Sequence, residues 1–458
     1  MTMDDLRRGR YSELSDWKEQ YVRKRMTPQE AVSQLRDQER ISCTGGGTWP
    51  KLFDRALAER LSRRELSVTL RTLFMLERPA VLSESCVESI RFQSGFFGAE
   101  RDFVGQGNVE YVPFHLGRTT EFHRQFAPRV VVMAVSPPDE DGWMSRSIWG
   151  THITRDTFTD EQCQFLIAEV NEKLPYLCSE GSRHTMVHVS EVDAILEGDY
   201  VWPEVSSRIP AETERRLAEY IADMIPDGAC LQLGFGGLAD AIGSVLAGGG
   251  KKDLGLQTEV MTNSVVDLMR MGIINNRQKE TCRGKSVAAA LVGDRRLWDF
   301  CHKNPDICMK EIDWVNHPAN IAKNSHVVSI NSAMEIDLTG QVAAESIGPR
   351  QYTGTGGQLQ WVVGAQWSPG GKSFLAIPST YRDGESGELC SKIKAFLPCG
   401  SIVTTPRTCV QYVATEYGVA DLRYQSVGRR VNEMIRIAHP AFREKLRYEA
   451  QKLLGYPI

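Results

Sequence analysis

The sequence lacks the features that mark nucleic-acid-binding, secreted or membrane-spanning proteins. Its 458 residues carry a formal net charge of −4, and no basic run interleaved with aromatic residues is present, which argues against nucleic acid as a partner. No apolar stretch is long enough to span a membrane. Residues 1–10 are charged where a signal peptide would be apolar. We therefore expect a cytoplasmic protein with no membrane partner.

The cysteines also lack a recognisable framework. There are 11 of them, no two are spaced as Cys-x-x-Cys, and the closest pair is Cys301 and Cys308, with His302 between them. This spacing matches no zinc pattern. An odd number of scattered cysteines predicts reduced thiols that are mostly buried, and we expect no metal site.

What the sequence does contain is an alternation of short apolar runs with amphipathic segments. Residues 130–135 and 401–405 are two of the runs that we interpret as strands, and residues 211–224 have the spacing of a helix. Nearly continuous apolar strands alternating with helices are typical of parallel sheets covered on both faces. The chain is 41% hydrophobic, which suffices for two or three cores, and we expect two. The expected fold class is α/β with two domains.

Two patterns occur once in each half of the chain. A strand, a glycine loop and a helix are predicted over residues 41–61 and again over residues 229–247. An apolar strand that ends in an acidic turn is predicted over 130–142 and again over 327–337. Such self-similarity suggests two domains of one fold, although common α/β units can also resemble each other by chance. The proline-bracketed stretch 203–210 predicts a boundary that gives domains 1–205 and 206–458.

Glu259 is the strongest candidate for a catalytic residue. It lies near the end of a predicted strand over 254–260, and a helix is expected to start at Asn263. A carboxylate at a strand end, served by loops rich in free backbone N–H groups, suits nucleophilic attack on an acyl group. The alternative is a solvated glutamate on an edge strand.

The two glycine loops nearest to Glu259 in sequence span residues 234–237 and 354–357. The first lies between a predicted strand and a predicted helix, a context that binds anions and polarised carbonyl oxygens. It matches a dinucleotide fingerprint only in part, because Ala239 replaces the third glycine. The second loop allows close approach of a ligand to the backbone, or it is an ordinary hairpin turn.

Three basic residues carry weaker signals. Lys372 and Arg382 flank a predicted strand and could meet phosphate groups as cations, although solvation at the surface is the default for each. His439 precedes a proline at an expected helix start, where a structural role is more common than a catalytic one. We therefore predict no histidine base.

Several motifs together closely resemble the acetyl-CoA hydrolase/transferase family, and in particular its 4-hydroxybutyrate and butyryl-CoA:acetate CoA-transferase branch. The motifs lie at residues 111–116, 135–140, 167–171, 329–342, 345–348, 352–358, 415–422 and 437–440. The resemblance covers nearly the whole chain. It departs from the family pattern at Gln360-Trp361, where Asp-Phe is expected, and at Thr262-Asn263, where Ser-Asp is usual, and both departures bear on the acyl specificity.

The resemblance implies a fold, a site and a substrate. The fold is two similar domains of the class I CoA-transferase type, with parallel-rich sheets covered by helices and the active site between the domains. Glu259 matches the catalytic glutamate. The residues that match CoA contacts are Gly234, Phe235, Gly236, Gly237, Leu238, Met334, Gly354, Gly356, Gly357 and Arg382. No permanently bound cofactor is implied, since coenzyme A enters as a substrate.

The resemblance also implies the reaction, which is transfer of CoA from an acyl-CoA to a small carboxylate such as 4-hydroxybutyrate, acetate or butyrate. It would proceed by a ping-pong mechanism through a glutamyl-CoA thioester on Glu259, in a homo-oligomer. Two alternatives remain open, an acyl-CoA hydrolase and a non-catalytic module that binds CoA or another ligand. A NAD-dependent oxidoreductase is disfavoured because the dinucleotide fingerprint is incomplete.

Overall fold

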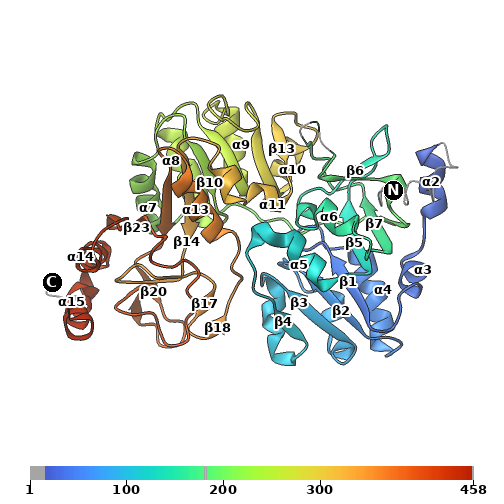
Figure 1. Cartoon of the computed structure of the whole chain (residues 1–458), viewed down its shortest axis with the longest axis horizontal. Coiled ribbons are helices and arrows are strands. Elements are labelled where there is room, and N and C mark those ends of the chain that lie inside the picture. Colours follow the sequence, from blue (N-terminus) through green and yellow to red (C-terminus); the bar gives the residue numbers. More distant parts are fainter. Residues whose placement is uncertain (1–15, 180, 182, 456–458) are drawn as a thin grey trace. The chain divides into compact units, whose positions relative to one another are not determined.

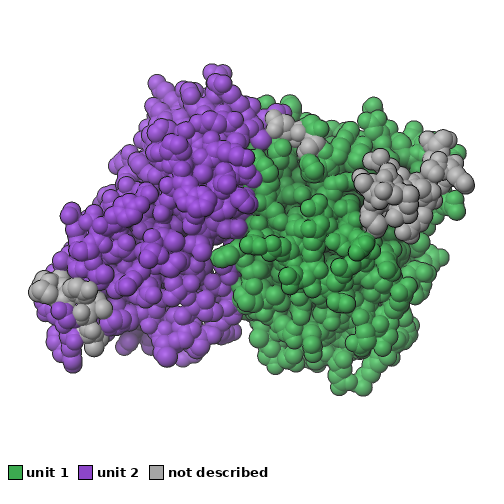
Figure 2. All heavy atoms as spheres, in the orientation of Figure 1, with its two compact units in different colours: residues 1–205, 287–314 green, residues 206–286, 315–458 purple. Residues whose placement is uncertain are grey.

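The computed structural model of the chain describes residues 16–179, 181 and 183–455. It divides into two compact units (Figure 2), one formed by Met1–Val205 with Val287–Trp314 and the other by Ser206–Ser286 with Val315–Ile458. Residues 287–314 thus group in space with the first unit although they follow the first part of the second in sequence. The expected homologous domains 1–205 and 206–458 stay a prediction.

The first unit is built from strands and helices that alternate along the chain (Figure 1). Its helices are α2 (Trp17–Lys24), α3 (Pro28–Ser33), α4 (Lys51–Ser62), α5 (Thr119–Phe126), α6 (Arg155–Phe158), α10 (Arg295–Cys301) and α11 (Ile312–Val315). Its strands are β1 (Glu39–Cys43), β2 (Val68–Thr72), β3 (Ile90–Ser94), β4 (Val109–Tyr111), β5 (Val130–Val135), β6 (Trp143–Ser145), β7 (Phe165–Asn171), β8 (Met186–His188), β9 (Ala194–Gly198), β12 (Ser286–Leu291) and β13 (Ile307–Met309).

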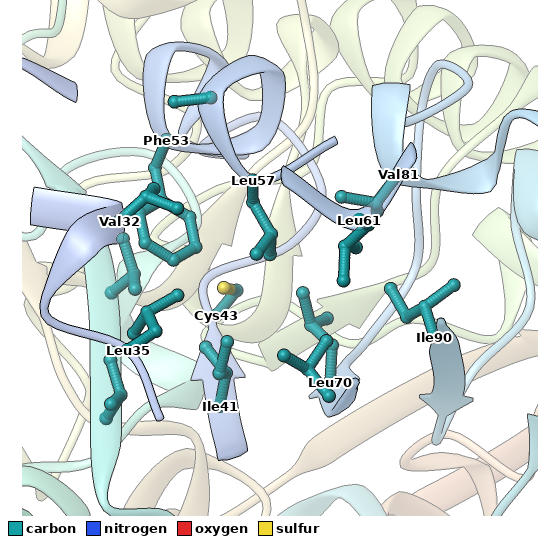
Figure 3. Close-up of a cluster of buried hydrophobic side chains, with 14 of the residues drawn as sticks. Val32, Leu35, Ile41, Cys43, Phe53, Leu57, Leu61, Leu70, Val81 and Ile90 are labelled. Carbon is teal, nitrogen blue, oxygen red and sulfur yellow. The ribbon is translucent and has the colours of Figure 1, made fainter. Parts of the chain in front are cut away.

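Seven strands of the first unit form a parallel sheet in the order β4-β3-β2-β1-β5-β7-β9. Every residue of β5 is buried, as its apolar sequence predicts for a strand in the middle of a covered sheet. Helix α4 packs on this sheet, and Figure 3 shows Phe53, Leu57 and Leu61 above the side chains of Ile41 and Leu70.

The second unit has the same alternation. Its helices are α7 (Glu212–Asp223), α8 (Gly237–Gly248), α9 (Asn263–Arg270), α12 (Pro318–Ile321), α13 (Gln358–Trp367), α14 (Val427–Ile437) and α15 (Pro440–Leu454). Its strands are β10 (Cys230–Leu233), β11 (Gly255–Met261), β14 (Val327–Ser332), β15 (Glu335–Asp337), β16 (Val342–Ala343), β17 (Ser346–Ile347), β18 (Arg350–Gln351), β19 (Lys372–Ala376), β20 (Thr380–Arg382), β21 (Leu389–Ser391), β22 (Ile393–Lys394), β23 (Tyr412–Thr415) and β24 (Gly418–Asp421).

Six of these strands are neighbours in the order β11-β10-β14-β19-β23-β24. The first five run parallel, and β24 returns antiparallel along β23. The central order is that of the first unit, because β10 lies between β11 and β14 just as β1 lies between β2 and β5. The predicted α/β class and the repeated strand, glycine loop and helix are confirmed.

Residues 401–405 do not form the strand that their apolar sequence predicts. They are an extended loop whose amides are satisfied individually: Ile402 N donates to Ser346 Oγ at 2.8 Å, and Thr404 N donates to the Val342 carbonyl at 2.9 Å. Ile402 and Val403 are exposed, whereas Thr404 and Thr405 are buried, so the apolar residues are not the covered ones. The prediction was wrong because local apolarity was taken as burial.

The described residues contain no group of three or more His, Cys, Asp or Glu side chains that could hold a metal ion. Nor does any helix in that part of the chain have the length and apolar character needed to cross a membrane. All cysteines are free thiols, with six of them buried and Cys399 exposed.

Candidate active site

The candidate site lies at the carboxyl edge of the parallel sheet in the second unit. Because β10, β11, β14 and β19 all run parallel, the segments that follow them emerge at one edge of the sheet, which is where α/β proteins bind ligands. The loop 234–236 follows β10, and Met334 follows β14. The turn after β19 leads into β20, where Arg382 is located.

Glu259 is the fifth residue of β11 and lies level with the start of the first glycine loop. The strand register pairs Leu231 with Leu256, and continuing it by three residues places Gly234 beside Glu259. The Thr258 hydroxyl donates to the Leu233 carbonyl at 2.9 Å, which ties the two strand ends together.

The Glu259 carboxylate has one oxygen held and one oxygen free. Oε2 accepts a hydrogen bond from Nδ2 of Asn316 at 2.5 Å. Within the described part of the chain, Oε1 accepts no hydrogen bond. A free carboxylate oxygen next to an anchored one is the geometry that a carboxylate nucleophile needs, since attack requires an available lone pair.

The surroundings of Glu259 shift the pKa of its carboxyl group. Burial raises its pKa from 4.5 to about 7, and the hydrogen bond from Asn316 opposes this rise. Glu259 is nevertheless only partly buried, so part of the residue is open to solvent. A carboxyl group with a strongly raised pKa at a sheet edge is a typical sign of a functional site.

The second glycine loop approaches the same carboxylate. A Cβ atom added to Gly357 would overlap both Oε2 of Glu259 and Nδ2 of Asn316, so only glycine fits here. Gly357 is also the N-cap of α13, and the loop is therefore a helix entry and not the hairpin turn considered as an alternative. The N-terminus of α13, the positive end of its helix dipole, therefore lies against the Glu259 carboxylate.

A buried glutamate holds this second loop in place. The carboxylate of Glu345 accepts hydrogen bonds from Thr355 Oγ1 and Gln351 Nε2, each at 3.1 Å, and from Thr404 Oγ1 at 3.0 Å. Thr355 lies between Gly354 and Gly356. Glu345 thus connects the glycine loop with the extended segment around residue 404.

The first glycine loop has the form of an anion-binding helix entry. Gly236 is the N-cap of α8 with φ of 99° and makes no side-chain cap hydrogen bond, so a ligand could meet the first N–H groups of the helix. A Cβ on Gly237 would overlap the guanidinium group of Arg208. Phe235 is 47% exposed at the tip of the loop.

Met334 and Arg382 lie farther along the same edge. Met334 is half-buried, and its backbone N–H donates to the Ala343 carbonyl at 2.9 Å. Arg382 is exposed, and its Nη1 donates to the Gly387 carbonyl at 3.1 Å within the hairpin of β20 and β21. Within the described residues, neither side chain forms a hydrogen bond or ion pair with Glu259, and their contact with CoA stays a prediction.

Sequence reasoning missed Asn316, the residue that holds Glu259. It directly follows α11, is fully buried and accepts at Oδ1 a hydrogen bond from Nε1 of Trp361 at 3.1 Å. Nothing in the local sequence Val-Asn-His-Pro marks this asparagine. The sequence marked Trp361 only as a departure from the family pattern and did not indicate its hydrogen bond to Asn316.

Other acidic and histidine side chains have structural partners. Glu169 has a pKa raised to about 7 by burial, but its carboxylate accepts from the backbone N–H groups of Leu52 and Phe53 and from the Tyr200 hydroxyl, and so it caps α4. His439 accepts from Ala441 N at 3.2 Å as the N-cap of α15. Its predicted structural role is confirmed.

Family models and known relatives show which family the chain belongs to. Residues 5–204 match the acetyl-CoA hydrolase/transferase N-terminal domain, and residues 293–450 match the C-terminal domain of the same family. The chain is 36% identical to the succinyl-CoA:cyclohexane-1-carboxylate CoA transferase of Geobacter metallireducens, over 95% of this chain and 97% of that protein. It is 34% identical to the butyryl-CoA:acetate CoA-transferase of Anaerostipes caccae, over 95% and 98%, and 34% identical to the 4-hydroxybutyrate coenzyme A transferase of Clostridium kluyveri, over 95% and 99%.

Solved structures give the same result for the fold. RipA from Yersinia pestis superposes with a TM-score of 0.88 at 32% identity and covers 96% of this chain and 100% of its own. The 4-hydroxybutyrate CoA-transferase of Porphyromonas gingivalis superposes with a TM-score of 0.76 at 30% identity and covers 95% of this chain and 100% of its own, so the fold is the α/β fold of the CoA-transferases. The chain belongs to the acetyl-CoA hydrolase/transferase family, and it is an enzyme of the CoA-transferase type.

Proposed function

We propose that this protein transfers CoA from an acyl-CoA thioester to a free carboxylate, with Glu259 as the covalent acceptor. The observation that carries this proposal is the Glu259 carboxylate itself, with Oε1 free, Oε2 held by Asn316, and Gly357 against it. No histidine is required, because carboxylates and thiolates act as the nucleophiles and leaving groups and little proton transfer is needed.

The first half of the reaction loads CoA onto the enzyme. Oε1 of Glu259 attacks the thioester carbonyl, the C–S bond breaks, and the products are an acyl-glutamyl anhydride and CoA thiolate. The thiolate then attacks Cδ of Glu259, which forms a glutamyl-CoA thioester and releases the first carboxylate. In this second attack Oε2 becomes the oxyanion, and the Nδ2 group of Asn316 is already hydrogen-bonded to it.

The second half runs these steps in reverse with a different acid. The acceptor carboxylate attacks Cδ and expels CoA thiolate, and the thiolate then attacks the acyl carbonyl of the new anhydride. The new acyl-CoA leaves and Glu259 is regenerated as a carboxylate. Each oxyanion donor in comparable acyl-transfer sites contributes roughly 3–4 kcal/mol, so Asn316 and the backbone N–H groups of the glycine loops together supply a large share of the rate enhancement.

We propose that CoA lies along the two glycine loops as a substrate, with no permanently bound cofactor. The contacts would come from Gly234, Phe235, Gly236, Gly237, Leu238, Met334, Gly354, Gly356, Gly357 and Arg382. The uncapped N-terminus of α8 supports this placement, because it suits a phosphate or carbonyl oxygen. We also propose a homo-oligomer, which light scattering on the purified protein tests.

The proposed acids are short-chain carboxylates of the acetate, butyrate and 4-hydroxybutyrate type. The names of two relatives, butyryl-CoA:acetate CoA-transferase and 4-hydroxybutyrate coenzyme A transferase, support this class. A relative named for succinyl-CoA and cyclohexane-1-carboxylate widens the set to be tested.

The experiment is a panel of acyl-CoA donors against carboxylate acceptors with the purified protein. We expect parallel lines in double-reciprocal plots, because donor and acceptor react in separate half-reactions. Intersecting lines would contradict the covalent route. Free thiol measured with and without acceptor separates transfer from hydrolysis, and thiol release that needs no acceptor would show an acyl-CoA hydrolase instead.

A further inference from the structure

The indole of Trp361 is linked to Glu259 through a single buried amide. Nε1 of Trp361 donates to Oδ1 of Asn316 at 3.1 Å, and Nδ2 of the same amide donates to Oε2 of Glu259 at 2.5 Å. Trp361 is 1% exposed and Asn316 is fully buried, so neither side chain exchanges its partner with water.

The chemistry of this chain of hydrogen bonds allows only one orientation of the amide. An indole N–H can donate but cannot accept, and a carboxylate can accept but cannot donate. A flipped Asn316 would turn its NH2 group toward the indole N–H and its Oδ1 toward Oε2. Two buried unfavourable contacts would then replace two hydrogen bonds.

Trp361 is also part of the element that brings Gly357 to the carboxylate. Its backbone N–H donates to the Gly357 carbonyl at 3.0 Å in the first turn of α13. One helical turn therefore sets both the glycine contact on Glu259 and the orientation of Asn316. Phe is the residue expected here from the family pattern. Its side chain has no N–H group and therefore could not orient Asn316.

We propose that Trp361 is a positioning residue for the transfer reaction, which keeps the N–H donors of Asn316 directed at Glu259. Its action is indirect, since it touches Asn316 and not the nucleophile. This inference rests on the proposed role of Glu259. Without the indole N–H, Asn316 spends part of its time flipped, and the donor to Oε2 and to the oxyanion on Cδ is lost for that fraction.

The test is Trp361→Phe, which removes the N–H group and keeps an aromatic side chain. We expect kcat to fall about 5–10-fold, as for the loss of one hydrogen bond to a neutral amide, with little change in KM for acyl-CoA. The acid limb of the pH profile should move to higher pH, because the Asn316 hydrogen bond is what lowers the pKa of Glu259.

Two controls separate positioning from packing. Trp298 in α10 is 3% exposed, and its Nε1 has no hydrogen-bond partner within the described residues, so Trp298→Phe should lose packing alone and leave the acid limb in place. In an Asn316→Ala background, Trp361→Phe should not move the acid limb any further. An unchanged limb in Trp361→Phe, or an equal shift in the Asn316→Ala background, would overturn the proposal.

A readout that does not depend on turnover keeps this test distinct from the test of the reaction. The unfolding free energy of Glu259→Gln relative to Glu259, measured against pH, reports the pKa of Glu259 in the folded state. We expect the midpoint of this difference to lie at higher pH in the Trp361→Phe background. No shift there contradicts the positioning role, whereas a wild-type protein without transferase activity contradicts the proposed reaction alone.

Discussion

Gly357 and Glu259 lie so close together that no Cβ atom fits between them. A Cβ built on Gly357 would overlap Oε2 of Glu259 and Nδ2 of Asn316. The backbone of Gly357 has φ of −100°, which any residue can adopt, so the requirement for glycine is steric and not conformational. The hydrogen bond between Asn316 and Glu259 depends on this space.

Gly357→Ala therefore tests the packing around the Glu259 carboxylate. The added methyl group should displace the carboxylate or the amide, and we expect kcat to fall about 100-fold, as a misplacement of about 1 Å can cause. The matched control is Gly248→Ala at the end of α8, where a Cβ meets nothing within 4 Å. Steady-state kinetics of both variants decide the matter, and near-wild-type turnover in Gly357→Ala would rule out the tight contact.

The activity should depend on pH in a way that Glu259 sets. Only the carboxylate form can attack the thioester, and burial raises the pKa of this group to about 7. We expect kcat/KM for acyl-CoA to rise with pH up to a limb near pH 7 and to fall about tenfold per unit below it. A limb near pH 4.5 would mean that Glu259 is solvated.

The same raised pKa predicts a stability effect of Glu259→Gln. A carboxyl group whose pKa is higher in the folded state than in the unfolded state contributes stability below pH 4.5, and this contribution is lost as the pH rises through about 7. The glutamine variant has no such loss. At pH 8 we expect the free energy of unfolding of the variant to exceed that of the wild type by about 1–3 kcal/mol. At pH 4.5 we expect the two proteins to be about equally stable.

Denaturant unfolding at the two pH values measures this difference. The same variant should lack transferase activity, so the site would gain stability as it loses function. An unchanged unfolding free energy at pH 8 would argue that the Glu259 charge is not desolvated.

Glu345 should stabilise the conformation of the second glycine loop through its hydrogen bonds. Glu345→Ala removes the acceptor for Thr355, Gln351 and Thr404, and a buried network that loses its centre costs about 1–3 kcal/mol. If residues 354–357 hold CoA, KM for acyl-CoA should rise more than kcat falls. Glu345→Gln keeps one acceptor oxygen and should show a smaller effect. An unchanged KM in both variants would contradict a role of residues 354–357 in binding CoA.

The sequence was sufficient for the parts of the fold that depend on local patterns. The apolar run 130–135 became the fully buried β5, and the glycine loop 234–237 led into α8 as expected. Residues 401–405 were also predicted as a strand, but their pairing is limited to an isolated antiparallel bridge between Thr405 and Val342, and burial cannot be read from apolarity alone. Strand pairing is a property of the whole sheet.

The site was predictable where chemistry follows the strand ends, and not where it depends on packing. Glu259 could be singled out as a candidate from its place before a helix start and its glycine-rich surroundings, and its catalytic role stays a prediction. Asn316 could not be singled out, because it is 57 residues away in sequence and reaches the carboxylate only through the folded turn between α11 and α12. The close approach of Gly357 and the raised pKa of Glu259 likewise arise from tertiary contacts.

The most direct test of the covalent role of Glu259 is to trap the enzyme after the first half-reaction. The protein is mixed with acyl-CoA without acceptor and treated with borohydride, which reduces a glutamyl thioester to an alcohol, and its peptides are analysed by mass spectrometry. We predict that the peptide with Glu259 is modified at this residue, in a manner that depends on acyl-CoA. Turnover with an unmodified Glu259, or modification at another carboxylate, would contradict the account.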